Sequence, residues 1–499
     1  MNGWLAAPII LPFSSAAISL LGRRHPLFQS GLAIATAFLH LGLGVWLLYR
    51  THMTGITVLH LGSWQAPYGI ALAADHLCAL MILITGVVYS AVVVYSRADI
   101  RKEILERGYY PLLHILVGGI SGAFLTSDLF NLYVWFEVML MASFALLVMG
   151  RTRSQLDGGV KYVAINLLST LLFLTGLGLI YALSGTLNMA HLHAKLQASS
   201  DPGLVAVVSM LFFTAFGIKA GLFPLFFWLP ASYHTPPVAV SAIFSGLLTK
   251  VGVYAMIRAF TLIFPFVDNG IRELILACAV LTMVIGVVGA ASHNEVRRIL
   301  SFHIISQVGY MVLGLGLFTP LALAGTVFYL LHHIVVKSNL FLISGLIRQW
   351  GGSFDLAKAG GLYRFRGIVA LLFFIPAFSL AGFPPLSGFW AKLILIKASV
   401  DAGYIGLAIA AAVVGLLTLY SMTKIWNEAF WKPAPQTGVN EAAKQMHFSP
   451  WMIAPVAAMA ALTVFIGICP EPVYQLARAA ADELLDPGAY VYTVVGHFP

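Results

Sequence analysis

Six ionisable residues lie within long apolar stretches of this sequence, and they are the residues best placed to do chemistry. One is an acid and five are lysines: Glu137, Lys219, Lys250, Lys337, Lys392 and Lys397. At membrane depth an ionisable side chain costs about 2.5 to 3.5 kcal/mol even on a lenient insertion scale. Groups that are retained despite this cost are typical of ion pathways, in which carboxylates and amines exchange protons.

The composition indicates that these stretches are membrane spans. Of the 499 residues, 60% are hydrophobic and 9% are charged, and the mean hydropathy is +0.90. A soluble globular protein carries about 25% charged residues, so this composition excludes a soluble enzyme. A spanning helix needs about 20 apolar residues, and the apolar stretches nearly fill the chain.

We therefore expect an all-α polytopic membrane protein with about fourteen spanning helices. They lie near residues 4–22, 28–49, 72–96, 110–127, 129–149, 160–184, 205–231, 238–262, 273–291, 299–318, 321–346, 366–400, 403–426 and 450–470. The seventh and twelfth are too long for one span, and each contains glycine and proline, at 219–224 and 382–388. We interpret both as broken helices, which at membrane depth occur only where the backbone is buried in protein or lines a water-filled cavity.

The distribution of positive charge predicts the orientation. Of the 28 lysines and arginines, 18 fall in the odd-numbered connections and 5 in the even-numbered ones or the C-terminal tail. Cytoplasmic loops are enriched in lysine and arginine, so both termini are expected on the outer face of a bacterial inner membrane. Topology thus accounts for the net charge of +9, and no nucleic-acid partner is expected.

The two breaks also predict an internal repeat. Lys219 lies just before the first break and Lys392 just after the second, and interrupted helices at matching positions in two halves of a transporter indicate its ion site. Helices 4–8 and 9–13 would form two inverted five-helix repeats. The predicted divisions are 1–108, 109–262, 263–427 and 428–499, the last holding a cytoplasmic loop, helix 14 and a tail. An offset of 173 residues aligns Glu137 with Tyr310.

The lysines do not all call for the same interpretation. Lys219, Lys250 and Lys392 lie near the middle of their spans, whereas Lys397 is close enough to a helix end for its ammonium to reach the headgroups. Glu137 is too short to reach water, so we expect it in a buried pair or on a hydrated pathway.

Several histidines are candidate relay groups, because an ordinary pKa of about 6.5 suits proton transfer near neutrality. His333 and Lys337 are four residues apart and share a helix face, so both are candidate pathway groups. His332 points about 100° away and is expected to be a hydrogen-bonded packing residue. His234 and His303 are predicted near the inner surface, where an interfacial role and proton uptake remain equally open.

The sequence gives no indication of a cofactor or a metal. Cys78, Cys278 and Cys469 each stand alone in apolar runs, without the paired spacing of a zinc or redox site, and we expect them to be small buried residues. No matching histidine pairs suit haem, and no glycine-rich nucleotide loop is present. A purely structural subunit would not explain why buried lysines coincide with broken helices.

Several stretches together resemble one family: the antiporter-like membrane subunits shared by Mrp-type multisubunit cation/proton antiporters, respiratory complex I and membrane-bound hydrogenases. They are SDLFNLY (127–133), FEVM (136–139), GLLTKVGVY (246–254), SFHIISQ (301–307), HHIVVK (332–337) and PPLSGFWAK (384–392). Within this family the sequence most resembles the Mrp branch and, in that branch, the D subunits. In the complex I pattern an aspartate and an alanine separate Trp-Leu-Pro from a histidine, whereas here Ala231 follows Trp228-Leu229-Pro230.

The resemblance implies a fourteen-helix fold and a polar axis through the membrane plane, formed by Glu137, Lys219, Lys250, His333, Lys337 and Lys392. It implies a proton-translocating subunit of a hetero-oligomeric Na⁺/H⁺ antiporter, with other Mrp-type subunits as partners. The alternative is a proton-pumping subunit of a complex I or hydrogenase type redox complex. Because no carboxylate cluster lies at membrane depth, we expect the Na⁺ path mainly in a partner subunit or at an interface.

The expected switch is the Glu137–Lys219 pair. Two unit charges about 4 Å apart interact by about 4 kcal/mol at an effective dielectric constant of about 20. Weakening this pair would make Lys219 release its proton toward Lys250 without a large movement of any helix.

Overall fold

The structure is a computed structural model and describes residues 2–197, 201–264, 269–365, 367–433 and 449–496. Within this part, twelve helices are long and apolar enough to cross a membrane, and two further apolar helices are shorter. Each of the fourteen predicted spans overlaps one of these helices. The prediction of an all-α polytopic membrane protein is therefore confirmed, whereas the inverted-repeat relation and the four predicted divisions stay predictions.

The elements follow one another along the chain with short connections. In order they are η1 (Gly3–Ala6), α1 (Ala7–Leu21), α2 (Pro26–Thr54), β1 (Thr57–His60), η2 (Leu61–Ser63), β2 (Ala71–Ala74), α3 (His76–Asp99), α4 (Lys102–Glu106), α5 (Tyr109–Leu125), α6 (Leu129–Val148), α7 (Arg153–Ser184), α8 (Met189–Gln197), α9 (Pro202–Ala220), α10 (Trp228–Ser232), α11 (Val238–Ile243), η3 (Phe244–Leu248), α12 (Thr249–Arg258), η4 (Ala259–Ile263), α13 (Asn269–Ser292), α14 (Val296–Leu317), α15 (Pro320–Gly351), α16 (Leu362–Phe365), α17 (Gly367–Ala381), α18 (Ser387–Asp401), α19 (Ile405–Trp426), η5 (Asn427–Trp431), α21 (Pro450–Ile468), α22 (Pro470–Leu485) and α23 (Gly488–Val495).

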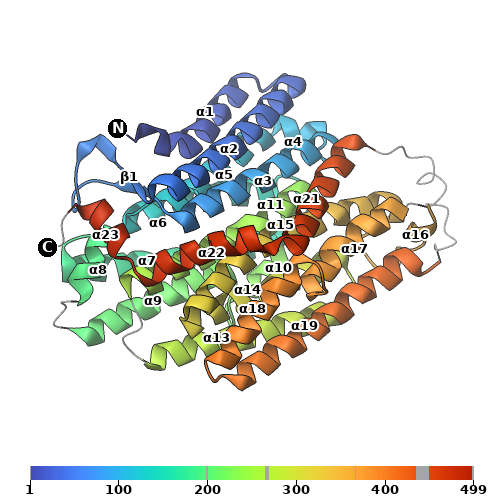
Figure 1. The fold of residues 1–499 in the computed structure, drawn as a ribbon. Helices are drawn as coiled ribbons and strands as arrows, with labels where there is room; N and C mark the ends of the chain where they lie inside the picture. Colours follow the sequence, from blue (N-terminus) through green and yellow to red (C-terminus); the bar gives the residue numbers. More distant parts are fainter. Residues whose placement is uncertain (1, 198–200, 265–268, 366, 434–448, 497–499) are drawn as a thin grey trace.

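One long helix, α15, forms the centre of the bundle. Its most apolar stretch is completely buried within the chain, and it packs against α3, α11, α14, α17, α18, α21 and α22. Helices α1 and α2 lie at one edge of the molecule and α13 and α19 at the opposite edge (Figure 1). These outer helices keep large apolar side chains exposed, as expected for surfaces that face lipid or other membrane proteins.

Both predicted breaks are present in the structure. Helix α9 ends at Ala220 and the short α10 begins at Trp228, while α17 ends at Ala381 and α18 begins at Ser387. The first break is held in place by the Trp228 indole N–H, which donates to the carbonyl of Ile218 at 3.0 Å. Lys219 thus lies in the last turn of a half-helix, and Lys392 in the second turn of one.

The described residues differ from the expectations at several helix ends. Helix α7 begins at Arg153 instead of residue 160, because Thr152 and Gln155 form a capping box that starts the helix earlier. The predicted tail after the last span is helical, with α22 running along the front of the bundle and α23 beyond it (Figure 1). The antiparallel β1–β2 hairpin before α3 was not predicted. Cys469 is exposed, so the expectation that it is buried is wrong.

Candidate functional site

The first half of the site lies where α6, α7 and α9 meet. The Glu137 carboxylate on α6 accepts a hydrogen bond from the Thr170 hydroxyl on α7 at 2.6 Å. The Lys219 ammonium on α9 lies 4.8 Å from the centre of the Phe136 ring, in a cation–π arrangement. Glu137 and Lys219 are close enough for their charges to interact. Glu137 and Lys219 thus interact without forming a direct ion pair, and each has another partner, Thr170 for the carboxylate and the Phe136 ring for the ammonium.

A small cavity adjoins Lys219. Its volume is about 30 Å³, and its polar lining consists of Tyr162, Asn166, Lys219, Trp228 and Tyr233. One water occupies roughly 10–15 Å³ by this measure, so the cavity has room for a water beside the ammonium. The Tyr233 hydroxyl is buried and has no hydrogen-bond partner among the described residues.

Lys250 is fully buried at the start of α12, directly after the π-helical segment η3. Its ammonium donates to the Ser245 carbonyl and to the Thr249 hydroxyl. A Cβ at Gly252, on the same helix, would come within 2.7 Å of the Ala220 backbone nitrogen. This close approach brings α12 against the end of α9 that carries Lys219.

The central helix α15 supplies the next two groups. His333 and Lys337 are both fully buried, and neither the two ring nitrogens nor the ammonium has a hydrogen-bond partner among the described residues. A Cβ at Gly246 in η3 would meet the Ser338 hydroxyl at 2.1 Å, so α15 packs directly against the segment before Lys250. His333, Lys337 and Lys250 are close enough for their charges to interact.

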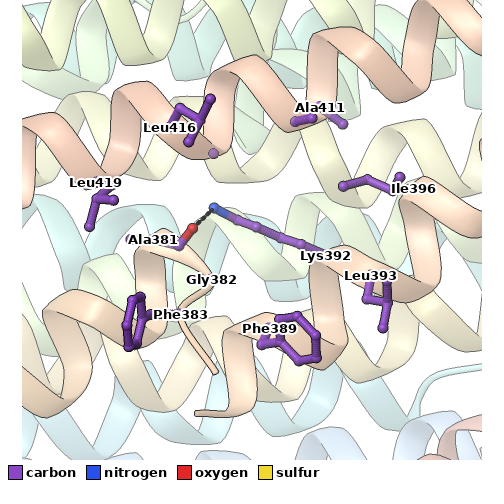
Figure 2. Close-up of a pocket in the computed structure, with 12 residues that line it drawn as sticks. Ala381, Gly382, Phe383, Phe389, Lys392, Leu393, Ile396, Ala411, Leu416 and Leu419 are labelled. Atoms are coloured by element: carbon purple, nitrogen blue, oxygen red, sulfur yellow. Dashed lines mark hydrogen bonds between the residues drawn. The ribbon is translucent and has the colours of Figure 1, made fainter. Parts of the chain in front are cut away.

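The second half of the site is centred on Lys392 of α18. Its side chain crosses the break and donates to the carbonyl of Ala381, the last residue of α17, at 2.9 Å (Figure 2). The ammonium lies 5.3 Å from the centre of the Tyr310 ring. Figure 2 also shows the apolar side chains of Phe383, Phe389 and Leu416 around Lys392. Together with Lys392 these side chains line a cavity of about 290 Å³.

Aromatic and hydroxyl groups lie between Lys392 and α15. Tyr310 stacks on Tyr329 with ring centres 5.2 Å apart, and the Tyr329 hydroxyl donates to the Gln307 side chain. His332 points toward the second break, where its Nδ1 shares a hydrogen bond of 2.8 Å with the Ser387 hydroxyl. Tyr329 also lies against the rings of His332 and His333, and so links the centre to the second half.

The other two predicted histidines differ in position. His234 is half-buried and accepts a hydrogen bond from Arg298 at 3.3 Å. His303 is fully buried, pairs with the Ser421 hydroxyl at 2.6 Å, and is close enough to Lys337 and Lys392 for their charges to interact. Burial, and then the charges of Arg298 and Arg297, lower the pKa of His234 to about 4. Lys397 is exposed and forms an ion pair with Asp401.

A polar pocket that the sequence did not predict opens near the C-terminal end of α3. Its volume is about 350 Å³, and its lining includes Asp99, Arg297, Arg348 and Gln155. Arg258, which the charge pattern assigned to a connecting loop, is buried at the end of α12 in an ion pair with Asp75. Asp75 is near the start of the predicted span 72–96 and Asp99 lies just beyond its end, so hydropathy did not identify either as a buried functional acid.

Comparison with known proteins places the chain in a family. Residues 126–418 match the family described as NADH:quinone oxidoreductase/Mrp antiporter, TM. The chain is 44% identical over 500 residues to the D-type subunit of a Na⁺/H⁺ antiporter from Alkalihalophilus pseudofirmus, covering 99% of this chain and all of that protein.

Two solved structures are also similar to this fold. One is a chain of the Mrp complex from Dietzia sp. DQ12-45-1b, with 32% identity, a TM-score of 0.91 and 99% of both chains covered. The other belongs to an archaeal membrane-bound sulfane sulfur reductase, with 26% identity, a TM-score of 0.89, and 99% of this chain and 100% of that chain covered. The similarity to curated D subunits extends over 99% of this chain. This protein therefore belongs to the NADH:quinone oxidoreductase/Mrp antiporter membrane-subunit family, on the branch of the Na⁺/H⁺ antiporter D subunits.

Proposed function

We propose that this chain is the proton-translocating subunit of a multisubunit Na⁺/H⁺ antiporter. One observation carries the proposal. Two lysines stand at two broken helices, each against an aromatic ring and a cavity, and buried ionisable groups on α12 and α15 lie between them. A structural subunit gains nothing from such costly groups, whereas a proton carrier requires them.

The proton route opens to the inner face, in this proposal, at the polar pocket near the end of α3. Four residues with small exposed fractions, Gln155, Tyr162, Asn166 and Thr170, follow one face of α7 at intervals of seven, four and four residues. Gln155 lines the pocket, Tyr162 and Asn166 line the small cavity beside Lys219, and Thr170 holds Glu137. This polar face supplies a route of about 22 Å, at 1.5 Å per residue, from the pocket to the Glu137–Lys219 pair.

Transfer along the axis follows from the electrostatics of the buried groups. Glu137 stabilises the charged form of Lys219, and loss of that interaction favours proton transfer toward Lys250. Among the described residues the nitrogens of His333 and Lys337 have no hydrogen-bond partner, and these two groups are the next to exchange protons in this proposal. Tyr329 and Tyr310 then lead to Lys392, whose ammonium borders the second cavity.

For the orientation of the chain, its membrane and its partners, the proposal keeps the expectations from the sequence. We infer that both termini face outward from a bacterial inner membrane and that other Mrp-type subunits complete the exchanger. The described residues bring together no group of three or more histidine, cysteine, aspartate or glutamate side chains. This supports a Na⁺ path that lies mainly in a partner subunit or at an interface.

The test uses everted membrane vesicles from cells that express the complete set of subunits. Na⁺ addition should collapse the imposed pH gradient in the wild type, whereas Glu137→Gln and Lys219→Ala should abolish this response. Their double variant should be no worse than either alone, because residues that act as one unit are non-additive. Lys161→Ala is the control, since that lysine pairs with Asp157 on the exposed face of α7. Near wild-type exchange by properly assembled Glu137→Gln or Lys219→Ala complexes would refute the proposal.

The alternative, a subunit of a redox-driven proton pump, is supported by the similarity to the sulfane sulfur reductase chain. The two functions differ in their partners. Purification of the complex through a tag on this chain should recover small antiporter subunits, and recovery of flavin or iron–sulfur subunits instead would establish the alternative.

A further inference from the structure

A second line of polar residues leaves the axis at Lys250. Lys250, Tyr254 and Arg258 are spaced by four residues on α12 and therefore share one face over about 12 Å. All three are buried. The Tyr254 hydroxyl donates to the Phe124 carbonyl on α5 at 2.6 Å and accepts from the Arg258 Nε at 3.2 Å.

This line ends at an acid on another helix. Arg258 forms an ion pair with Asp75, and the exposed fractions of the two side chains are only 7% and 2%. Asp75 also caps α3 by accepting from the Cys78 backbone N–H at 2.8 Å. The other end of α3 is likewise held by an acid, since Asp99 accepts from the Ala239 backbone N–H at 3.2 Å. Helices α3 and α11–α12 therefore cross the membrane side by side and antiparallel, with Asp75 and Asp99 at opposite faces.

The C-terminal helices cover the Asp75 end. Glu483 of α22 accepts hydrogen bonds from His76, at 2.9 Å from the backbone N–H and at 2.7 Å from Nδ1. The Arg258 guanidinium lies 5.2 Å from the centre of the Tyr490 ring on α23. His76 and Glu483 are partly exposed, so the line reaches the surface just beyond Asp75.

We propose that Tyr254 and Asp75 form a proton passage between Lys250 and the face where α3 begins, which the charge pattern predicts to be the outer one. The inference rests on the proposed function and adds to it an opening on the outer face. Asp75, Glu483 and Tyr490 all lie outside the stretch that matches the family profile.

The groups along this line suit different tasks. The Tyr254 hydroxyl takes a proton from one neighbour as it passes its own proton to the other, so a proton can move between the Lys250 amine and the Asp75 carboxylate. The Asp75 carboxylate becomes a neutral acid when it holds the proton and ionises again when the proton leaves. Arg258 remains charged throughout and acts as a positioning residue that pairs with the ionised carboxylate.

A purely structural role is the competing explanation, since a buried ion pair can simply anchor α3, α12 and α23. Tyr254→Phe separates the two because it removes one oxygen and retains the ring. Tyr89→Phe is the matched control: Tyr89 is buried, and its hydroxyl is hydrogen-bonded to His114 away from this line. The complete complex is used for both variants, with assembly checked by co-purification.

We expect Tyr254→Phe to slow Na⁺-driven exchange by about 100-fold, the lower range for a lost proton-transfer group, and to raise the solvent deuterium isotope effect. Tyr89→Phe should keep the wild-type rate and isotope effect. Asp75→Asn, which preserves the cap, should resemble Tyr254→Phe. Arg258→Lys should retain more activity than Arg258→Gln.

An assembled Tyr254→Phe complex with the wild-type rate would overturn the inference. Equal losses in Tyr254→Phe and Tyr89→Phe, with an unchanged isotope effect, would also overturn it. Lys219→Ala separates this failure from a failure of the proposed function. If Lys219→Ala is inactive while Tyr254→Phe is normal, only the passage through Tyr254 and Asp75 is wrong, whereas normal activity in both refutes the proposed function as well.

Discussion

The hydrogen bond between Thr170 and Glu137 can be removed by one substitution, and the resulting loss in the rate of exchange can be calculated from the free energy of that bond. Thr170→Val keeps the side-chain shape and removes the hydroxyl that donates to the carboxylate at 2.6 Å. A hydrogen bond to a charged group contributes about 1.5–3 kcal/mol, and each 1.36 kcal/mol corresponds to about a tenfold change in rate. If the ionised carboxylate is required in the slow step, exchange should fall by about 10- to 100-fold.

Three further variants make this measurement specific. Thr175→Val is the control, because Thr175 lies on the same helix, is exposed, and bonds only the Leu171 carbonyl of its own helix. Glu137→Gln should lose more activity than Thr170→Val. The double variant should match Glu137→Gln, since residues in contact do not add independently. The assay is Na⁺-induced collapse of the pH gradient in everted vesicles, normalised to assembled complex. Wild-type exchange by Thr170→Val, or a double variant slower than Glu137→Gln, would show that Thr170 does not act through Glu137.

Three other predictions concern orientation, the second half and a peripheral histidine. In a cysteine-free background, a membrane-impermeant thiol reagent should label Gly496→Cys but not Ala98→Cys in intact cells, and labelling at 98 would reverse the orientation. Lys392→Ala should abolish exchange, whereas Lys397→Ala, which loses only an exposed ion pair, should retain most of it; equal losses would contradict this assignment. Because its lowered pKa of about 4 keeps His234 neutral above about pH 5, His234→Gln should leave the pH profile between about pH 6 and 9 unchanged, and a shifted profile would implicate it in proton uptake.

Much of the fold follows from the sequence because hydropathy is a local property. Each apolar stretch predicts its own helix, and Gly-Pro clusters mark the breaks after Lys219 and before Lys392. The helix ends are less predictable. The start of α7 depends on a capping box, which needs only two side chains and adds no apolar residues to the pattern.

The site was only partly predictable for a related reason. A lysine or a glutamate inside an apolar run can be recognised from the sequence, because placing an ionisable side chain at membrane depth costs free energy. This criterion identifies Glu137, Lys219, Lys250, Lys337 and Lys392. The groups that position them are ordinary residues whose role depends on packing. The sequence does not indicate that Thr170 contacts Glu137 or that Phe136 contacts Lys219, because these contacts depend on the packing of α6, α7 and α9. Likewise, Asp75 and Arg258 lie far apart in sequence, and only the antiparallel packing of α3 and α12 brings them together.

The helix breaks also have an electrostatic reason to coincide with lysines. A helix C-terminus carries a partial negative charge and unpaired carbonyl groups. Lys219 is a residue of the last turn of α9, and the Lys392 ammonium donates to the carbonyl of the last residue of α17. Both lysines are therefore associated with the C-terminal end of a half-helix.

Such an end stabilises a cation by about 0.3–1 kcal/mol at exposed sites and up to about 2 kcal/mol where it is partly buried. That is enough to offset much of the insertion cost of one charged lysine, about 2.5 to 3.5 kcal/mol, but not all of it. Part of the cost therefore remains for neighbouring groups to offset, such as Glu137 near Lys219. A change at such a neighbour can then decide whether the proton stays. An unbroken helix would hold its carbonyl groups in internal hydrogen bonds and offer the ammonium no comparable partner.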